Sequence, residues 1–274
     1  MLVAFDVGNT NIVIGVYENR RLLRSWRMET NQRKSADEYG MLLNQLFSYD
    51  GLDIRGVNDV IISTVVPSMI YTLQHLSQKY FNRQAIVVGP GIKTGLIVKY
   101  DNPKQLGSDR IVTAVAALDQ YEGHLIIIDF GTATTICAVT ANSEFLGGLI
   151  APGIKISSDA LFEKTAKLPR VEIESPGRTI CRNTTDGIKA GLVYGNVGMV
   201  EYIVARMKKE LEAYTGDGLP ISVIATGGMA SLMDSETDCI DHVDKLLTLT
   251  GLERIYEKNK SLHARRPKSG GNDF

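Results

Sequence analysis

Two apolar runs in this chain each end in an aspartate that is followed by a turn of small polar residues. The first run reads LVAFD and ends at Asp6, and the second reads LIIID and ends at Asp129. Glycine, asparagine and threonine follow the first acid, and Gly131 and Thr132 follow the second. Such turns direct backbone N–H groups toward an anion, while the carboxylate attracts a cation. The two segments predict binding sites for a metal-bound triphosphate.

An ordinary hairpin explains either turn taken alone, because Asn and Gly are favoured turn residues in any case. The repetition of an apolar strand, an acid and a Gly/Thr turn in one chain favours the nucleotide interpretation.

A third acid, Asp109, lies in the segment GSDR directly before an apolar helical pattern. Capping explains this segment, since Ser108 is a favoured N-cap and an acid in the first turn is stabilised by the helix dipole. The same dipole keeps Asp109 ionised, so that it could orient a substrate hydroxyl while Arg110 fixes a polar group. Both interpretations remain open on these residues.

The elements that must position these acids repeat along the chain. After each acid, two alternating strands follow around a short turn, and a further apolar strand comes later in each half. This pattern predicts an α/β protein with an internal duplication of a mixed sheet flanked by helices. The expected strands are Ile12–Tyr17, Leu22–Met28 and Asp59–Pro67 in the first half, and Thr135–Thr140, Phe145–Ile150 and Pro220–Ala230 in the second.

Helical patterns occupy most of the remaining chain. Ser35 and Glu38 form a capping box before an apolar stripe, which indicates a structural helix. Other expected helices are Ser68–Phe81, Asp109–Tyr121, Thr185–Tyr214 and Leu249–Lys260. The segment 261–274 is polar and basic, and we expect a disordered tail there.

The longest expected helix contains Gly187, Gly191, Gly195 and Gly198. Each glycine costs a helix up to ~1 kcal/mol relative to alanine. This cost indicates close packing of another element, or of a second subunit, against the helix backbone.

Composition excludes several classes of function. The 274 residues are 44% hydrophobic with a formal net charge of -1, so neither nucleic acid nor an anionic membrane is expected as a main partner. The three cysteines form no CxxC pair, and no apolar run is long enough to span a bilayer. We therefore expect a cytoplasmic protein.

Taken in order, the motifs resemble those of type III pantothenate kinases over residues 1–259. They are DVGNTN at Asp6, YDNP at Tyr100, GSDR at Gly107, DFGTATT at Asp129, GGLIAPG at Gly147, NTTDGIKAGLVYGNVG at Asn183 and ATGG at Ala225. The resemblance implies the actin-like ATPase fold, in which two duplicated ribonuclease-H-like domains close over ATP. The corresponding domains here are residues 1–117 and 118–260.

The resemblance also implies ATP-dependent phosphorylation of pantothenate to 4'-phosphopantothenate, the first step of coenzyme A biosynthesis, by a homodimer. Asp109 corresponds to the proton acceptor. Phosphoryl transfer passes through a loose transition state, so this carboxylate can accept the proton with an unraised pKa. Asp129 corresponds to the ligand of a monovalent cation, K+ or NH4+, and Asp6 lies at the position that faces Mg2+. The implied ATP contacts are Asp6, Val7, Gly8, Asn9, Thr10, Asn11, Ile12, Val13 and Thr132. The implied pantothenate contacts are Tyr100, Gly107, Ser108, Asp109, Arg110 and Thr184.

Two other functions remain as alternatives. A regulator of transcription is one, although the net charge and the lack of a basic recognition helix disfavour direct DNA binding. A filament-forming or chaperone-like ATPase of the same fold is the other, and its ATP turnover would be indifferent to pantothenate.

Overall fold

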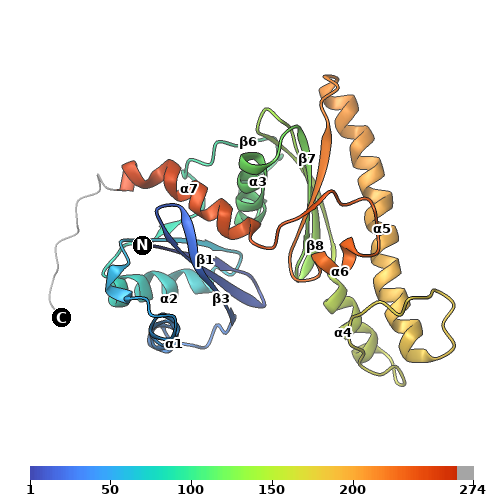
Figure 1. Ribbon diagram of the computed structural model, residues 1–274, viewed down its shortest axis with the longest axis horizontal. Helices are drawn as coiled ribbons and strands as arrows, with labels where there is room; N and C mark the ends of the chain where they lie inside the picture. Colours follow the sequence, from blue (N-terminus) through green and yellow to red (C-terminus); the bar gives the residue numbers. More distant parts are fainter. Residues whose placement is uncertain (264–274) are drawn as a thin grey trace. The chain divides into compact units, whose positions relative to one another are not determined.

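The computed structural model describes residues 1–263, which divide into two compact units. Unit 1 contains Met1–Gly95, Gly107–Val115 and the described residues from Thr248 onward, and unit 2 contains Leu96–Leu106 and Ala116–Leu247. Each unit is built on one mixed sheet (Figure 1). The expected tail lies outside the described residues from position 264, while residues 261–263 still belong to a helix.

Five strands form the sheet of unit 1, in the order β3-β2-β1-β4-β5. The first three are antiparallel neighbours, and β4 and β5 run parallel to β1. Their bounds are β1 Leu2–Val7, β2 Asn11–Glu18, β3 Arg21–Glu29, β4 Asp59–Thr64 and β5 Ile86–Val87. The expected strands of the first half are confirmed, and β5 was not anticipated.

One face of this sheet is covered by α1 (Ala36–Tyr49) and α2 (Ser68–Leu76), which continues as a π-helical turn, Ser77–Phe81. The capping box is confirmed, because the Ser35 hydroxyl accepts from the Glu38 amide and the Glu38 carboxylate accepts from the Ser35 amide. A 3-10 turn, Ile54–Gly56, joins α1 to β4. The apolar side chains of β1 that point to this face, such as Phe5, are fully buried.

Two helices whose residues come from later in the chain complete unit 1. They are the first half of α3 (Ser108–Gln120) and α7 (Leu247–His263). Leu249 approaches Gly15 of β2, and Gly251 lies so close to the Val112 carbonyl that a β-carbon there would collide with it. Glycine at position 251 therefore lets α7 pack directly against the backbone of α3.

Six strands form the sheet of unit 2, in the order β11-β10-β7-β8-β9-β6. Their bounds are β6 Ile97–Val98, β7 His124–Phe130, β8 Ala133–Val139, β9 Glu144–Pro152, β10 Ile221–Thr226 and β11 His242–Val243. From β9 to β11 the order and directions repeat those from β3 to β5 in unit 1. The expected duplication is confirmed.

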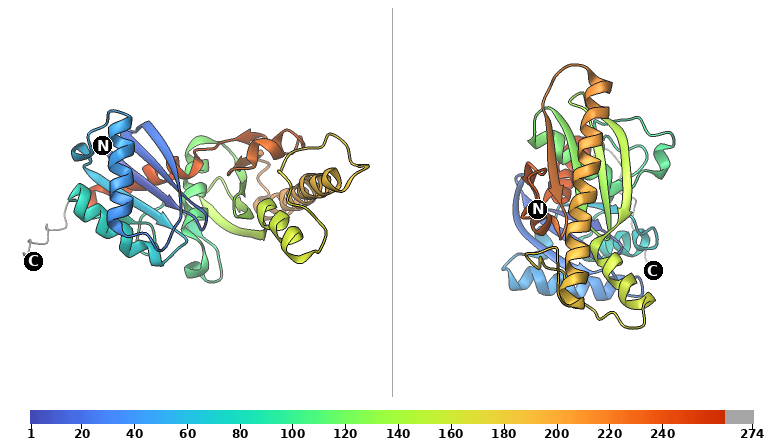
Figure 2. Two further views of the ribbon diagram at one scale, coloured as in Figure 1. Left: turned by 90° about the horizontal axis from the view of Figure 1, so that it is seen from below. Right: turned by 90° about the vertical axis from the view of Figure 1, so that its right-hand side faces the viewer.

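The helices of unit 2 are α4 (Ile154–Lys164), α5 (Thr184–Thr215) and α6 (Ala230–Asp234), with a 3-10 turn at Pro103–Gln105. Helix α5 extends along the sheet beside β7 and β8, and α4 lies near its N-terminal end (Figure 2). Its buried side, including Val193, Val197 and Val204, packs with the apolar side chains of β7 and β10. Helices α4 and α6 were not predicted.

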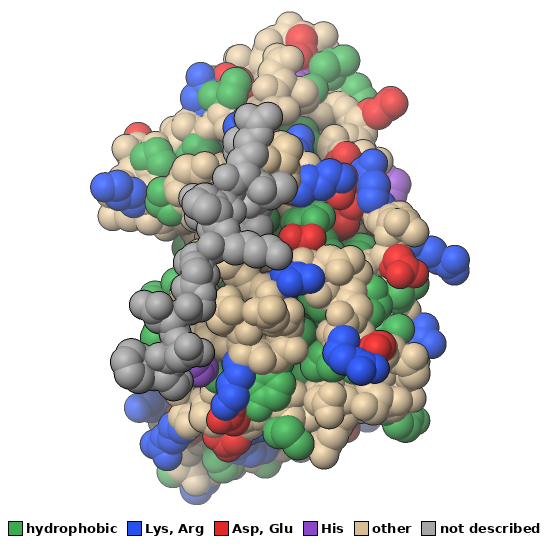
Figure 3. Space-filling model, turned by 90° about the vertical axis from the view of Figure 1, so that its left-hand side faces the viewer, with side chains coloured by type: hydrophobic (Ala, Val, Ile, Leu, Met, Phe, Trp, Pro, Cys, Tyr) green, Lys and Arg blue, Asp and Glu red, His purple; other side chains and the backbone are tan. Residues whose placement is uncertain are grey.

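Within residues 1–263, none of the helices combines the length and apolar character that crossing a membrane requires. Among the described side chains on the face drawn in Figure 3, Lys and Arg groups are interspersed with Asp and Glu groups. This mixture agrees with the near-zero net charge.

Candidate active site

Asp6 lies at the end of β1 in unit 1, where the parallel strand β4 also ends. In the register of these strands, Asp6 is paired with Ser63. Phe5 and Val7 point into the core under α1 and α2, so the alternation of side chains places Asp6 on the opposite face of the sheet. Ser63 shares that face, because its neighbour Ile62 also belongs to the same core.

The turn after Asp6 is held in a tight conformation. The Gly8 amide donates to the Asn11 carbonyl at 2.9 Å, and the Thr30 hydroxyl donates to the Gly8 carbonyl at 2.7 Å. Asn9 and Thr10 are exposed at the tip of this turn. The tip of this turn is therefore accessible from solvent.

The segment GSDR begins α3 at the same edge of the unit 1 sheet. Ser108 is the first residue of the helix, and its hydroxyl donates to the Thr64 carbonyl at the end of β4, at 3.0 Å. The Ser63 hydroxyl in turn donates to Ser108 Oγ at 3.0 Å. The Ser108 hydroxyl, for which the sequence offered a helix-capping role, therefore forms its hydrogen bond with the end of β4.

Asp109 follows in the first turn of α3. One carboxylate oxygen accepts from the Arg110 amide at 2.8 Å and lies over Gly107. Arg110 itself is buried, with 6% of its surface exposed. Asp6 and Asp109 thus belong to the same edge of one unit and are connected through the Ser63–Ser108 hydrogen bond.

Burial raises the pKa of Asp109, while the hydrogen bond from the Arg110 amide and the charge of Arg110 lower it less strongly. The expectation of an unraised pKa is wrong. Helix-dipole reasoning omitted desolvation, which penalises the charged carboxylate and which only the folded structure reveals. A raised pKa makes Asp109 a better proton acceptor than an exposed aspartate.

Asp129 occupies the equivalent place in unit 2, at the end of β7. It is paired with Thr226 of the parallel strand β10, as Asp6 is paired with Ser63. The following residue, Gly227, has φ +92 and lies against the Asp129 carboxylate and the Phe130 carbonyl. The carboxylate and the main-chain carbonyl thus place oxygen atoms together beside Gly227, and hard cations prefer oxygen ligands.

The turn between β7 and β8 contains Gly131 and Thr132. A β-carbon on Gly153 would collide with the carbonyl oxygens of both residues, so the glycine before α4 permits this close approach. The Gly131 amide donates to the Ala133 carbonyl at 3.2 Å. Thr132 thus lies on a turn that is fixed between β7 and the beginning of α4.

Tyr100 and Thr184, two expected pantothenate contacts, lie in unit 2. The Tyr100 ring packs against Phe145, with centroids 6.4 Å apart, and its edge lies beside Gly147. Thr184 is the exposed first residue of α5, which Asn183 caps by accepting from the Asp186 amide at 2.8 Å.

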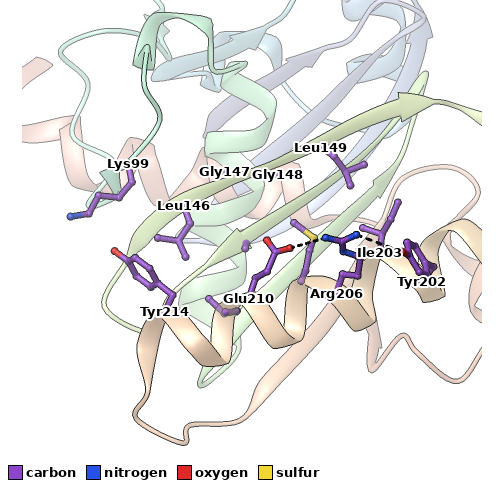
Figure 4. A pocket seen from close by; sticks show the side chains of 13 residues that line it. Lys99, Leu146, Gly147, Gly148, Leu149, Tyr202, Ile203, Arg206, Glu210 and Tyr214 are labelled. Atoms are coloured by element: carbon purple, nitrogen blue, oxygen red, sulfur yellow. Dashed lines mark hydrogen bonds and ion pairs between the residues drawn. The ribbon is translucent and has the colours of Figure 1, made fainter.

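A separate groove of about 740 Å³ lies in unit 2, between β8, β9 and the C-terminal half of α5 (Figure 4). Its floor is apolar and includes Leu146 and Leu149, and Arg206 lies between Glu210 and Tyr202 at its border. The expected site residues are absent from its lining. This groove is therefore distinct from the acids at the strand ends.

Sequence reasoning missed Ser63. The segment DVIISTVVP predicted a strand, and its small polar residues were noted only as the strand's end. A hydroxyl residue at the end of the parallel strand in both halves, Ser63 and Thr226, was the available signal. The register shows that each lies next to an acid.

Solved structures share this fold at low sequence identity. A putative Baf family transcriptional activator from Campylobacter jejuni matches with TM-score 0.58 and 19% identity, over 94% of this chain and 99% of its own. A putative 2-dehydro-3-deoxygalactonokinase from Sinorhizobium meliloti matches with TM-score 0.55 and 10% identity, over 100% of both chains. The activator of the 2-hydroxyisocaproyl-CoA dehydratase from Clostridium difficile, with bound ADPNP, matches with TM-score 0.50 and 12% identity, over 100% of this chain and 99% of its own.

The repeated sheets and these neighbours define a protein of the actin-like ATPase and sugar kinase fold class. Within that class, the family profile described as type III pantothenate kinase matches residues 2–206. The chain belongs to the type III pantothenate kinase family and is a kinase. Membership supports phosphorylation of pantothenate in coenzyme A biosynthesis, with ATP and a divalent metal.

Proposed function

We propose that this chain transfers the γ-phosphoryl group of ATP in line to the primary hydroxyl of pantothenate, and that Asp109 accepts the hydroxyl proton. The observation that carries this assignment is the half-buried Asp109 carboxylate in the first turn of α3, which begins beside the strand ends where Asp6 lies. Phosphoryl transfer depends mainly on alignment and charge neutralisation, so a positioned acceptor suffices.

The ATP phosphates are assigned to residues 6–13 of unit 1, which span the end of β1, the turn after it and the beginning of β2, together with Thr132 in unit 2. Asp6 is suited to Mg2+, which usually keeps several waters and takes one or two carboxylates plus phosphate oxygens. No cluster of three or more His, Cys, Asp or Glu side chains arranged for a metal occurs within residues 1–263. The single carboxylate of Asp6, beside the assigned phosphate-binding turn, fits a Mg2+ ion whose other ligands are waters and phosphate oxygens.

Asp129 is assigned to a monovalent cation, K+ or NH4+. The oxygen atoms around Gly227, from the Asp129 carboxylate and the Phe130 carbonyl, fit such a hard cation. The cation would supply positive charge near the nucleotide. Gly107, Ser108 and Arg110 in unit 1, and Tyr100 and Thr184 in unit 2, are assigned to pantothenate, and the enzyme is assigned to the cytoplasm.

The glycine side of α5 supports a homodimer. Apart from the neighbouring backbone of α5 itself, nothing in the described chain lies within 4 Å of the β-carbon positions of Gly187, Gly191, Gly195 or Gly198. Tyr202, one turn further along this side, is 63% exposed. The close packing that these glycines indicate is thus not supplied by the described part of the chain itself, and a second copy is the proposed partner.

A coupled assay of ADP release, with and without pantothenate and in K+ or Li+ buffers, tests the proposed function. We expect turnover that requires pantothenate and is higher in K+, with a product heavier by one phosphoryl group in mass spectrometry. ATP turnover indifferent to pantothenate would instead indicate the ATPase alternative and contradict the proposal.

A further inference from the structure

Ser63 is a buried polar residue whose surroundings point to a role beyond the packing of β4. Its side chain is fully buried, with 0% of the residue exposed. It is paired with Asp6 in the β1–β4 register and lies on the sheet face toward which α3 begins. A hydroxyl at this position therefore lies between the two acids assigned to unit 1.

The hydrogen bonds around Ser63 have a defined direction. The Ser63 hydroxyl donates to Ser108 Oγ, and the Ser108 hydroxyl donates to the Thr64 carbonyl, both at 3.0 Å. The first residue of α3 is therefore tied to β4 at two consecutive positions. Both hydrogen bonds meet at Ser108 Oγ, so together they fix the position of that oxygen relative to the end of β4.

Asp109 immediately follows this tied residue. Its carboxylate accepts from the Arg110 amide and lies over Gly107, so its direction follows the path of the first turn of α3. A displacement of this turn relative to β4 would move the carboxylate relative to Asp6 by the same amount.

We propose that Ser63 is a positioning residue that holds Asp109 in line for phosphoryl transfer through its hydrogen bond to Ser108. This inference rests on the proposed function of Asp109. Ser63 itself touches neither the substrate nor the nucleotide in this assignment and acts through the beginning of α3.

The matched comparison is between Ser63→Ala and Ser77→Ala. Ser77 is also 0% exposed and donates one hydrogen bond, to the Arg83 carbonyl at 2.7 Å, but it lies after α2, away from the acids. Both variants lose a buried hydroxyl. We expect Ser63→Ala to lower kcat about 10- to 100-fold with little change in the KM for ATP, because small misplacement of a reacting group carries that penalty. Ser77→Ala is expected to retain the wild-type kcat.

A double-mutant cycle with Asp109→Asn separates positioning from a general structural effect. If Ser63 acts through Asp109, Ser63→Ala lowers kcat in the wild type but has little further effect on the residual turnover of Asp109→Asn. Equal effects of Ser63→Ala in both backgrounds would overturn the proposal. Ser63→Thr keeps the hydroxyl, and Thr226 shows that threonine fits the equivalent place in unit 2, so a normal kcat is expected for it.

Hydrogen exchange of the amides in residues 107–112 provides a readout without substrate. We expect faster exchange in Ser63→Ala than in Ser77→Ala or the wild type, and unchanged exchange would overturn the positioning role. A wild-type enzyme that released no ADP with pantothenate would overturn the proposed function instead, and the exchange measurement would still decide whether Ser63 holds the beginning of α3.

Discussion

Gly227 lies against Asp129, and a β-carbon on Gly227 would come within 2.5 Å of the Asp129 carboxylate oxygen Oδ1. Its φ of +92 is also a conformation that residues with side chains rarely adopt. The loop after β10 can therefore contact the acid at the end of β7 only because this residue is glycine.

Gly227→Ala is accordingly expected to lower the free energy of unfolding by at least about 2 kcal/mol, through the positive φ and the collision with Asp129. It is also expected to abolish stimulation of turnover by K+. Gly228→Ala is the matched control, because no described residue other than its chain neighbours lies within 4 Å of its β-carbon position. Urea unfolding and ADP release in K+ and Li+ check both variants, and equal behaviour of the two would contradict this account of Asp129.

Asp109→Asn is expected to lower kcat by about 10²- to 10⁴-fold, the usual contribution of a positioned acid or base. ATP binding and the fold should persist. The acid limb of the wild-type pH–rate profile should lie above the ordinary aspartate pKa of about 3.9, because burial raises the pKa of Asp109. If the acid limb lay at or below that ordinary aspartate pKa while the proteins folded normally, Asp109 would be removed from the mechanism.

The same shift in the pKa of Asp109 predicts a dependence of stability on pH. A carboxyl whose pKa is higher in the folded than in the unfolded chain stabilises the fold below its unfolded pKa, and this contribution is lost as pH rises through the folded pKa. Asp109→Asn should thus gain stability relative to the wild type between about pH 4 and pH 7. Urea unfolding at both pH values measures the difference, and a relative loss of stability toward pH 7 would contradict it.

Thr134 carries a buried hydroxyl for which the described residues provide no hydrogen-bond partner. Thr134→Val keeps the shape and removes the unsatisfied group, so an increase of about 1 kcal/mol in the free energy of unfolding is expected. Thr140→Val is the matched change, because the buried Thr140 hydroxyl accepts from the Glu144 amide at 3.2 Å. That variant should lose about 1 kcal/mol. A loss in both variants would show that the Thr134 hydroxyl is satisfied in solution.

Gly195→Leu tests the proposed dimer. Nothing in the described chain lies near the β-carbon position of Gly195, and leucine favours a helix over glycine by roughly 0.5–1 kcal/mol, so folding of the subunit should not suffer. A second copy packed against the glycine side would be displaced. Analytical ultracentrifugation should show a dimer for the wild type and a monomer for the variant, and a dimer of unchanged affinity would place the interface elsewhere.

Local patterns predicted much of this fold. Ser35 and Glu38 predicted the beginning of α1, because a capping box depends only on residues three positions apart. The strands around Asp6 and Asp129 were predictable because hairpin neighbours are close in sequence. The two-residue strands β6 and β11 were not, since they exist only through pairing with distant strands. Helix α4 lacks a side-chain cap at Gly153, so its beginning carried no signal.

For the candidate site, residue types predicted which acids are placed at strand ends, but not their environment. Desolvation of Asp109 arises from packing, and the bond between Ser63 and Ser108 joins segments 45 positions apart. Neither property can be inferred from residue spacing in one sequence.

The return of α7 to unit 1 affects how this protein is made. Leu249 and Gly251 contact residues of β2 and α3, so the amino-terminal unit lacks part of its core until residues beyond position 248 exist. A nascent chain on the ribosome therefore keeps that incomplete surface exposed until these residues have been synthesised. The core of unit 1, which begins with the first strand of the chain, is consequently completed only after unit 2 has been synthesised.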